Sequence, residues 1–188
     1  LMALGALSAG ADVFDPNKPI ILMTEDKLTR PVKVLAQANG APENLAVLSY
    51  NGCGNLSAAR LLASMITDMR PDVNIIIHRD RDFRTDQEMH FELECAAAER
   101  ERNGVDRVTE VFTPFNDVEH SFSQAEHLKR VFNNIQPDLI DAAITQVTSL
   151  RRDTLVNAAR VAREKIASSL YRSPRKRAKP QWGDSGMP

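Results

Sequence analysis

The chain has 188 residues, of which 43% are hydrophobic and 26% are charged, a composition typical of a globular protein and not of a disordered one. The net charge of -1 excludes a uniformly basic nucleic-acid coat, so positive charge for a polyanion must be local or supplied by metal ions or a partner. Two cysteines, Cys53 and Cys95, are too few for a disulfide scaffold or a zinc cluster, and no apolar run approaches the ~20 residues of a membrane span, so we expect a cytoplasmic protein without membrane association.

Four short apolar segments are predicted to be β-strands. They cover residues 18–24, 45–50, 73–78 and 107–113. The apolar runs are continuous rather than alternating, as expected for parallel strands that are covered on both faces. The third contains the β-branched run Ile75-Ile76-Ile77, which makes it the most strand-like part of the chain.

Helical patterns alternate with these strands. Between the strands, helices are predicted over residues 30–38, 56–69 and 86–103. After the last strand we expect a helix over 123–132, capped by Ser123, and one long helix over 139–171. The alternation predicts an α/β fold, a parallel sheet of about four strands flanked by helices, with a helical C-terminal extension.

Carboxylates follow three of the four predicted strands. Glu25 and Asp26 follow the first strand, Asp80 and Asp82 follow the third, and Glu119 lies beyond the fourth. The second strand leads into the glycine-containing loop 51–55. Because sites in parallel sheets form beyond the carboxyl ends of the strands, we expect these residues to share one edge.

Asp80 and Asp82 are predicted to bind a divalent ion. If the backbone stays extended, their side chains point to the same side, where two carboxylates repel each other unless a cation lies between them. Oxygen ligands suit Mg²⁺ (or Mn²⁺), which would assist attack on a phosphodiester. A solvated acidic pair neutralised by Arg79 and Arg81 is the simpler alternative, and acids at two other strand ends favour the metal site over it. His78 is interpreted as a structural residue.

The order of these motifs resembles a known family. Glu25, the glycine loop and Asp80-x-Asp82 are similar to the Toprim domain of topoisomerases, primases and related nucleases. The segments IIIHRDRDFRTDQE and NDVEHSF resemble Toprim domains of overcoming-lysogenization-defect (OLD) family nucleases, which follow an ABC-type ATPase domain and have relatives in anti-phage systems such as Gabija. The resemblance covers roughly residues 15–135. It implies a Toprim-like Rossmannoid sheet and a metal-dependent DNA endonuclease or nickase.

The resemblance also implies roles for individual residues. Glu25 matches a metal ligand or general acid–base group, Asp80 and Asp82 match the metal-binding aspartates, and Glu119 matches a further acidic ligand. In the loop after the second strand, Gly52 and Gly54 match positions where the backbone approaches phosphate.

Three positions depart from the family pattern, and one expected residue is not assigned. Asp26 stands where a glycine is usual, Thr29 where a second acid is usual, and Arg84 where a serine is usual. The late catalytic lysine is not assigned, and its candidates are Lys165, Lys176 and Lys179. These departures leave open a second hypothesis, in which the chain is an inactive Toprim-like assembly or regulatory module. A receiver-like signalling domain is disfavoured by the D-x-D pair and by the absence of a lysine after RVTEVFT.

The predicted organisation has four parts. A lead-in over residues 1–17 precedes a catalytic domain over 18–136, a helical extension over 137–172 and a basic tail over 173–188. Because the chain begins with Leu1, we expect an ATPase domain in cis or in a partner chain, and the extension suggests a homo-oligomer. The tail is expected to contact the DNA backbone through Arg175, Lys176, Arg177 and Lys179, and a basic tail that is only solvated is the alternative.

Overall fold

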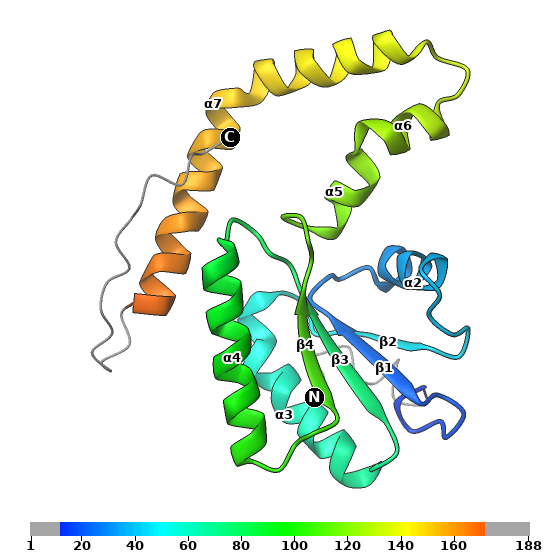
Figure 1. The fold of residues 1–188 in the computed structure, drawn as a ribbon, viewed down its shortest axis with the longest axis vertical. Coiled ribbons are helices and arrows are strands. Elements are labelled where there is room, and N and C mark those ends of the chain that lie inside the picture. Colours follow the sequence, from blue (N-terminus) through cyan, green and yellow to red (C-terminus); the bar gives the residue numbers. More distant parts are fainter. Residues whose placement is uncertain (1–11, 172–188) are drawn as a thin grey trace. The chain divides into compact units, whose positions relative to one another are not determined.

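The computed structural model describes residues 12–171 of the chain. The chain divides into two compact units between Val131 and Phe132, and each unit is described by itself. The first contains a four-stranded sheet and its helices, and the second contains one long helix (Figure 1).

All four strands of the sheet are parallel, in the order β2-β1-β3-β4. They are β1 (Ile20–Thr24), β2 (Ala46–Ser49), β3 (Asn74–Arg79) and β4 (Val108–Phe112). The two central strands, β1 and β3, pair in a register that sets Thr24 opposite His78. The four predicted strands and the α/β fold class are therefore confirmed.

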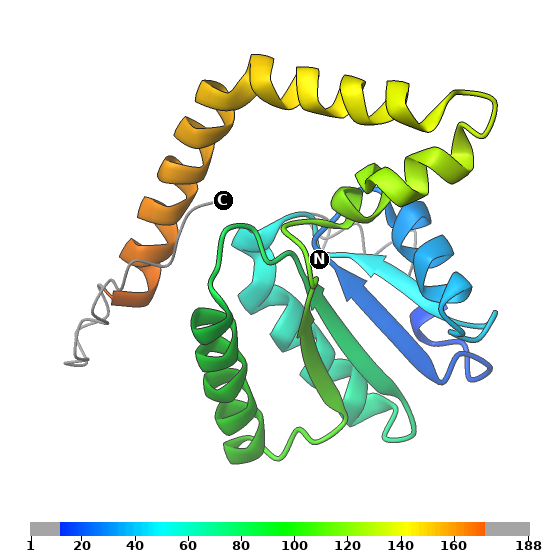
Figure 2. The same cartoon turned by 45° about the horizontal axis from the view of Figure 1, so that its top comes forward.

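Helices cover both faces of the sheet, which explains why the strands have continuous apolar runs. One face packs against α3 (Leu56–Met69) and α4 (Asp86–Arg102), and the other against α2 (Thr29–Ala38) (Figure 2). The core on the α3 side joins Ile21, Met23, Ile75 and Ile77 of the central strands to Ala59, Ala63 and Ile66 of α3. A smaller core on the α2 side joins Leu22 of β1 to Val32 of α2.

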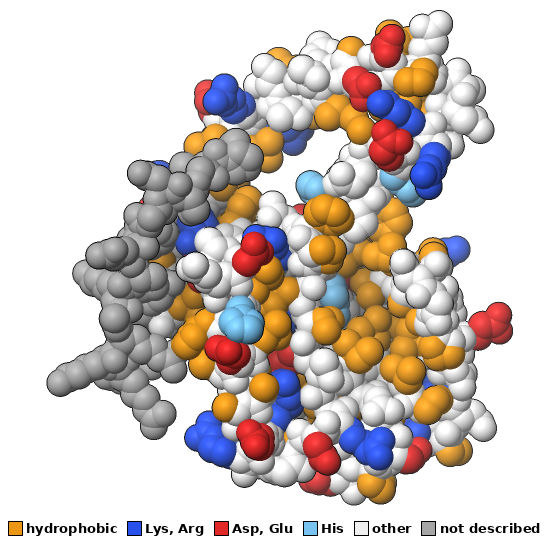
Figure 3. Space-filling view, in the orientation of Figure 1, with side chains coloured by type: hydrophobic (Ala, Val, Ile, Leu, Met, Phe, Trp, Pro, Cys, Tyr) orange, Lys and Arg blue, Asp and Glu red, His pale blue; other side chains and the backbone are white. Residues whose placement is uncertain are grey.

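The α2 side of the sheet is covered less completely than the α3 side. Side chains alternate across a strand, so Ile77 faces α3 and is fully buried, whereas Val111 faces the other way and is 36% exposed. Hydrophobic side chains reach the surface over the strands beside α2 (Figure 3). The functional side chains described below lie at the carboxyl end of this more open face.

The predicted helix over 123–132 is wrong in its start and its cap. The structure has two short helices there, α5 (Val118–Ser123) and α6 (Ala125–Val131), separated by Gln124 in an extended conformation. Asp117 is the cap, since its side chain accepts a hydrogen bond of 2.7 Å from the His120 amide. Ser123 instead ends α5, where its hydroxyl donates to the His120 carbonyl oxygen.

The second unit contains α7 (Pro137–Tyr171), which confirms the helical C-terminal extension. Several of its large apolar side chains are exposed, among them Leu139, Val147 and Leu150. Within residues 12–171, no helix combines the length and the apolar character that crossing a membrane requires.

Candidate metal centre

The candidate site lies at the carboxyl ends of the two central strands. The chain leaves β1 toward β2 on one side of the sheet and later returns to β3 on the other side, so the strand order reverses between β1 and β3. The connection through α2 runs over one face and the connection through α3 over the other. In open parallel sheets such a reversal opens a crevice beyond the strand ends, where ligands bind.

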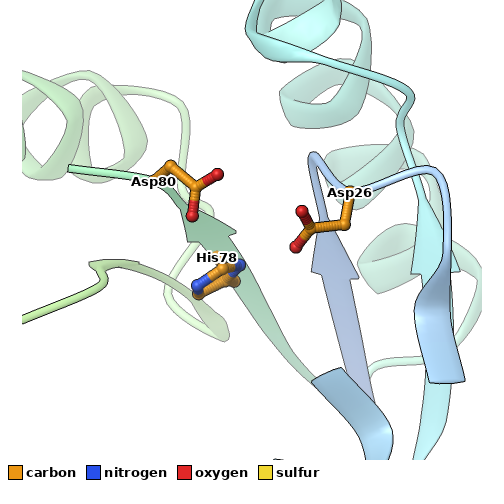
Figure 4. A group of neighbouring side chains, drawn as sticks. All are labelled: Asp26, His78 and Asp80. Atoms are coloured by element: carbon orange, nitrogen blue, oxygen red, sulfur yellow. The ribbon is translucent and has the colours of Figure 1, made fainter. Parts of the chain in front are cut away.

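Three potential metal ligands meet at this reversal. Asp26, His78 and Asp80 each offer one ligand atom, and these atoms all lie within 4.8 Å of one another. All three residues are partly buried. The carboxylates of Asp26 and Asp80 point toward each other from the ends of β1 and β3, beside the His78 ring (Figure 4).

Thr24 orients two of these three ligands from its position at the end of β1. Its buried hydroxyl donates to Asp26 Oδ2 at 2.8 Å and lies 3.0 Å from His78 Nδ1. Because the single hydroxyl proton goes to Asp26, the bond to His78 requires a proton on Nδ1, which leaves Nε2 with a free lone pair. Burial lowers the pKa of His78, which favours this neutral form. The Tyr50 hydroxyl also fixes the strand end by donating to the His78 carbonyl oxygen at 2.9 Å.

Asp80 has no basic side chain paired with it in the described part of the chain. Burial raises its pKa to about 8, and its hydrogen bond with Glu25 and the Glu25 charge contribute to the rise. Burial likewise raises the pKa of Glu25, although its hydrogen bond with Asp80 acts in the opposite direction. Asp80 Oδ1 is buried and has no hydrogen-bond donor. Two carboxylates ~4 Å apart repel by about 4 kcal/mol at an effective dielectric constant of ~20, so this pair needs a shared proton or a cation.

The structure places Asp82 differently from the sequence-based expectation. Strand β3 ends at Arg79, and Asp82 has a left-handed backbone with φ of 50°, so the extended geometry that would align it with Asp80 is absent. Its amide donates to the Asn116 carbonyl oxygen at 2.7 Å, and its carboxylate pairs with Arg84 at 3.0 Å. The Asp82 charge still raises the pKa of Glu25 and Asp80, but Asp82 is not one of the three grouped ligands.

Glu119 also lies outside the group of three ligands. It occupies the first turn of α5, where its side chain is exposed. The loop before α5 contacts the loop after β3, because the Asp82 amide donates a hydrogen bond to the Asn116 carbonyl oxygen. The loop that precedes Glu119 therefore lies near the site, but the Glu119 carboxylate does not belong to the ligand group.

The arginines that the sequence offered as neutralising partners do not pair with Asp80. Arg79 points to the other face of the sheet, where it pairs with Glu92 and Glu110. Arg81 pairs with Asp86 at 3.0 Å. Across residues 12–171, no salt bridge involves Asp80.

The glycine loop supports the site through its backbone. Gly52 has φ of 97°, a conformation that favours glycine, and its amide donates to the Glu25 carbonyl oxygen at 2.7 Å. That amide is thus engaged in holding the Glu25 segment. Gly54 lies in the 3₁₀ turn η2 (Cys53–Asn55) that leads into α3. The predicted DNA contacts Arg175, Lys176, Arg177 and Lys179 lie outside the described residues.

Sequence reasoning missed Asp26 and His78 as potential ligands. Asp26 was noted as a departure from the family pattern, and His78 was interpreted as structural. The signal that could have found them is the repeated spacing of Thr24-x-Asp26 and His78-x-Asp80 after paired strands. Since Thr24 lies opposite His78, continuing the register sets Asp26 opposite Asp80.

Comparisons with protein-family models, with curated proteins and with solved structures found no match. The resemblance to Toprim domains therefore rests on the order of the motifs in the sequence, and it stays a prediction.

The three grouped residues fit a divalent cation. Two carboxylates and one imidazole form a ligand set that Mn²⁺ accepts, and Mg²⁺ can use the carboxylates, with water completing the coordination of either ion. The buried Asp80 Oδ1 without a donor is the atom that such a cation would satisfy. The hydrogen bonds of Thr24 with Asp26 and His78 supply the outer support that metal ligands usually have.

Proposed function

We propose that this chain is a metal-dependent phosphodiesterase that cleaves DNA as an endonuclease or nickase. The observation that carries the proposal is the group Asp26, His78 and Asp80 at the strand-order reversal, with a buried Asp80 oxygen that lacks a donor. Hydrolysis of a phosphodiester with a bound Mg²⁺ or Mn²⁺ is the chemistry that such a site supports best.

The choice of DNA as substrate rests on the sequence resemblance to Toprim domains of OLD family nucleases. The same resemblance extends the proposal to an ATPase domain, in cis or in a partner chain, and to a role in anti-phage defence. These parts are independent of the metal centre and are tested separately.

Each site residue has a defined task in this proposal. Asp26, His78 and Asp80 would hold the ion, which when bound would polarise a phosphoryl oxygen and lower the pKa of a water molecule. Thr24 keeps the Asp26 carboxylate and the His78 ring in the orientation that binding needs. Because these ligands are already held in place, no entropy is lost in ordering them when the substrate binds.

Glu25 is the candidate for proton transfer. Its pKa is raised by burial, and it is hydrogen-bonded to Asp80 beside the ligand group. A carboxyl group with a raised pKa holds a proton closer to neutral pH than an ordinary glutamate does, which suits donation to a leaving oxygen. The backbone bond from the Gly52 amide holds the Glu25 segment in place.

The second candidate function is a Toprim-like module without catalytic activity. It is favoured by the pairing of Asp82 with Arg84 and by the exposure of Glu119, since neither carboxylate belongs to the ligand group. A protein of this kind would bind Mn²⁺ without cleaving DNA.

The test is cleavage of supercoiled plasmid in Mg²⁺ or Mn²⁺ by the wild-type protein and two matched variants. Asp80→Asn removes one charge from the ligand group, and Asp106→Asn makes the same change at an exposed position just before β4, at the opposite edge of the sheet. We expect wild type and Asp106→Asn to nick or linearise the plasmid and Asp80→Asn to lose more than the ~10–100-fold in rate that is typical of a residue supporting a metal ligand. Equal cleavage by all three would place the activity elsewhere. Mn²⁺ binding without cleavage by any of them would favour the inactive module.

A further inference from the structure

Arg84 neutralises Asp82, an acid in the loop that follows the proposed ligand Asp80. Its Nη1 pairs with Asp82 Oδ2 at 3.0 Å, the closest charged partner of that carboxylate in the described structure. Asp82 lies two residues after Asp80 in the turn that follows β3, and it is not one of the three grouped ligands. A guanidinium group therefore already neutralises Asp82, a carboxylate that a second metal ion could otherwise use as a ligand.

Contacts on several sides hold the Arg84 side chain in place. Its Nε donates to Glu92 Oε1 at 2.8 Å, and its Nη1 also donates to the Arg81 carbonyl oxygen. The guanidinium lies 5.4 Å from the centre of the Phe112 ring. Glu92 is itself fixed by its ion pair with Arg79, which is nearly fully buried. An ion that displaced Arg84 from Asp82 would have to break or bend these contacts, and its charge would repel the guanidinium.

The backbone of Asp82 also favours the pairing with Arg84. Its φ of 50° is uncommon for a residue other than glycine. The hydrogen bond from the Asp82 amide to the Asn116 carbonyl oxygen stabilises this conformation. The resulting turn places the Asp82 carboxylate beside Arg84, two residues further along the chain. Bringing Asp82 into line with Asp80 would require this turn to open.

We infer that the chain binds a single divalent ion, at Asp26, His78 and Asp80, and that Arg84 takes the place of a second ion by neutralising Asp82. The inference rests on the proposed metal-dependent function and specifies how the site balances its charge. Arg84 is a positioning residue in this arrangement, because it acts through Asp82.

The experiment is a titration of the full metal-free chain with Mn²⁺, in which electron paramagnetic resonance counts free ions. We expect the wild type to bind one Mn²⁺ per chain. Asp82→Asn keeps the size of the side chain and an oxygen for Arg84, so it should still bind one ion with less than about a threefold change in affinity, well below the ~10–100-fold loss typical of a supporting metal-site residue. Asp80→Asn should lose the ion.

A second set of variants tests the role of Arg84. Arg84→Gln removes the positive charge and should expose a second, weaker Mn²⁺ site at Asp82, and the double variant Asp82→Asn/Arg84→Gln should return to one ion. Arg102→Ala, which removes an exposed arginine near the end of α4, is the control and should bind one ion. Circular dichroism and thermal unfolding establish that each variant is folded.

The possible results separate this inference from the proposed function. Two Mn²⁺ ions bound by wild type, or loss of the ion in Asp82→Asn, would overturn the inference and leave metal-dependent chemistry in place. A folded Arg84→Gln variant that binds one ion would also overturn it. If wild type binds no Mn²⁺, the proposed function and the inference both fail.

Discussion

Two acids on opposite faces of the sheet, Glu110 of β4 and Asp80 just after β3, have opposite electrostatic surroundings. On the α3 side, the Glu110 side chain is completely buried and meets Arg60 at 2.8 Å and 2.9 Å, Arg100 at 3.1 Å and Arg79 at 3.5 Å. On the α2 side, Asp80 has no arginine or lysine partner among residues 12–171 and carries a buried oxygen without a donor.

The difference shows how this fold neutralises an acid when the acid serves only the structure. Three arginines from α3, β3 and α4 converge on Glu110, and Arg79 and Arg84 further pack against the Phe112 ring. Asp82 is also neutralised by an arginine, since Arg84, two residues further along the chain, pairs with its carboxylate. An acid that has no basic partner in such an arginine-rich surrounding supports the proposal of a cation at this site.

Removing the charge of Glu110 and, separately, that of Asp80 tests this comparison. We expect the larger change in unfolding free energy at Glu110, which is surrounded by arginines. Glu110→Gln leaves three guanidinium groups around a neutral amide, and breaking a buried ion pair in this way costs about 3–5 kcal/mol of unfolding free energy. Urea unfolding monitored by circular dichroism measures the loss. A loss below ~1 kcal/mol would mean that the arginines repack toward water, and the contrast with Asp80 would then be weaker.

The next largest effect is expected on Mn²⁺ affinity when the Thr24 hydroxyl, which orients two of the ligands, is removed. Thr24→Val keeps the size of a fully buried side chain but removes the bonds to Asp26 and His78, so we expect Mn²⁺ affinity to fall ~10–100-fold. Isothermal titration calorimetry measures it. Thr67→Val is the matched control, because that hydroxyl donates to the Ser64 carbonyl oxygen within α3, away from the ligand group, and the change should leave the affinity unchanged. A similar loss in both variants would indicate general destabilisation.

Much of the fold could be predicted from the sequence because the signals are local. Continuous apolar runs gave the strands, and Thr85 with Glu88 forms the capping box that starts α4. The split between α5 and α6 was missed because Asp117, rather than Ser123, supplies the cap and because Gln124 adopts an extended conformation. Neither feature interrupts the helical pattern of apolar residues.

The site was harder to predict because it depends on strand register and on one turn. Glu25 and Asp80 follow from their positions at strand ends, but the grouping of Asp26 with His78 requires knowing that Thr24 lies opposite His78. The left-handed turn at Asp82 cannot be read from the residues Asp80-Arg81-Asp82, since its backbone bond partner, Asn116, is distant in the chain. Tertiary contacts therefore decide which of the strand-end acids become neighbours.

The smallest expected change in unfolding free energy is that of Asp80→Asn, which tests most directly whether Asp80 lacks a cationic partner. Its sign is opposite to that of Glu110→Gln. The raised pKa of Asp80, about 8, means that the metal-free folded chain binds a proton which the unfolded chain releases near pH 4. Stability from this group is complete below pH ~4 and is lost as the pH rises toward 8. Asp80→Asn has no such loss, so it should be more stable than wild type at pH 8.5, by ~1 kcal/mol after allowance for solvent screening of a partly exposed group, and nearly equal at pH 4.5. Urea unfolding in EDTA at both pH values measures the difference. A variant less stable than wild type at pH 8.5 would mean that Asp80 is already neutralised within the chain, and the case for a cation at this site would lose its electrostatic basis.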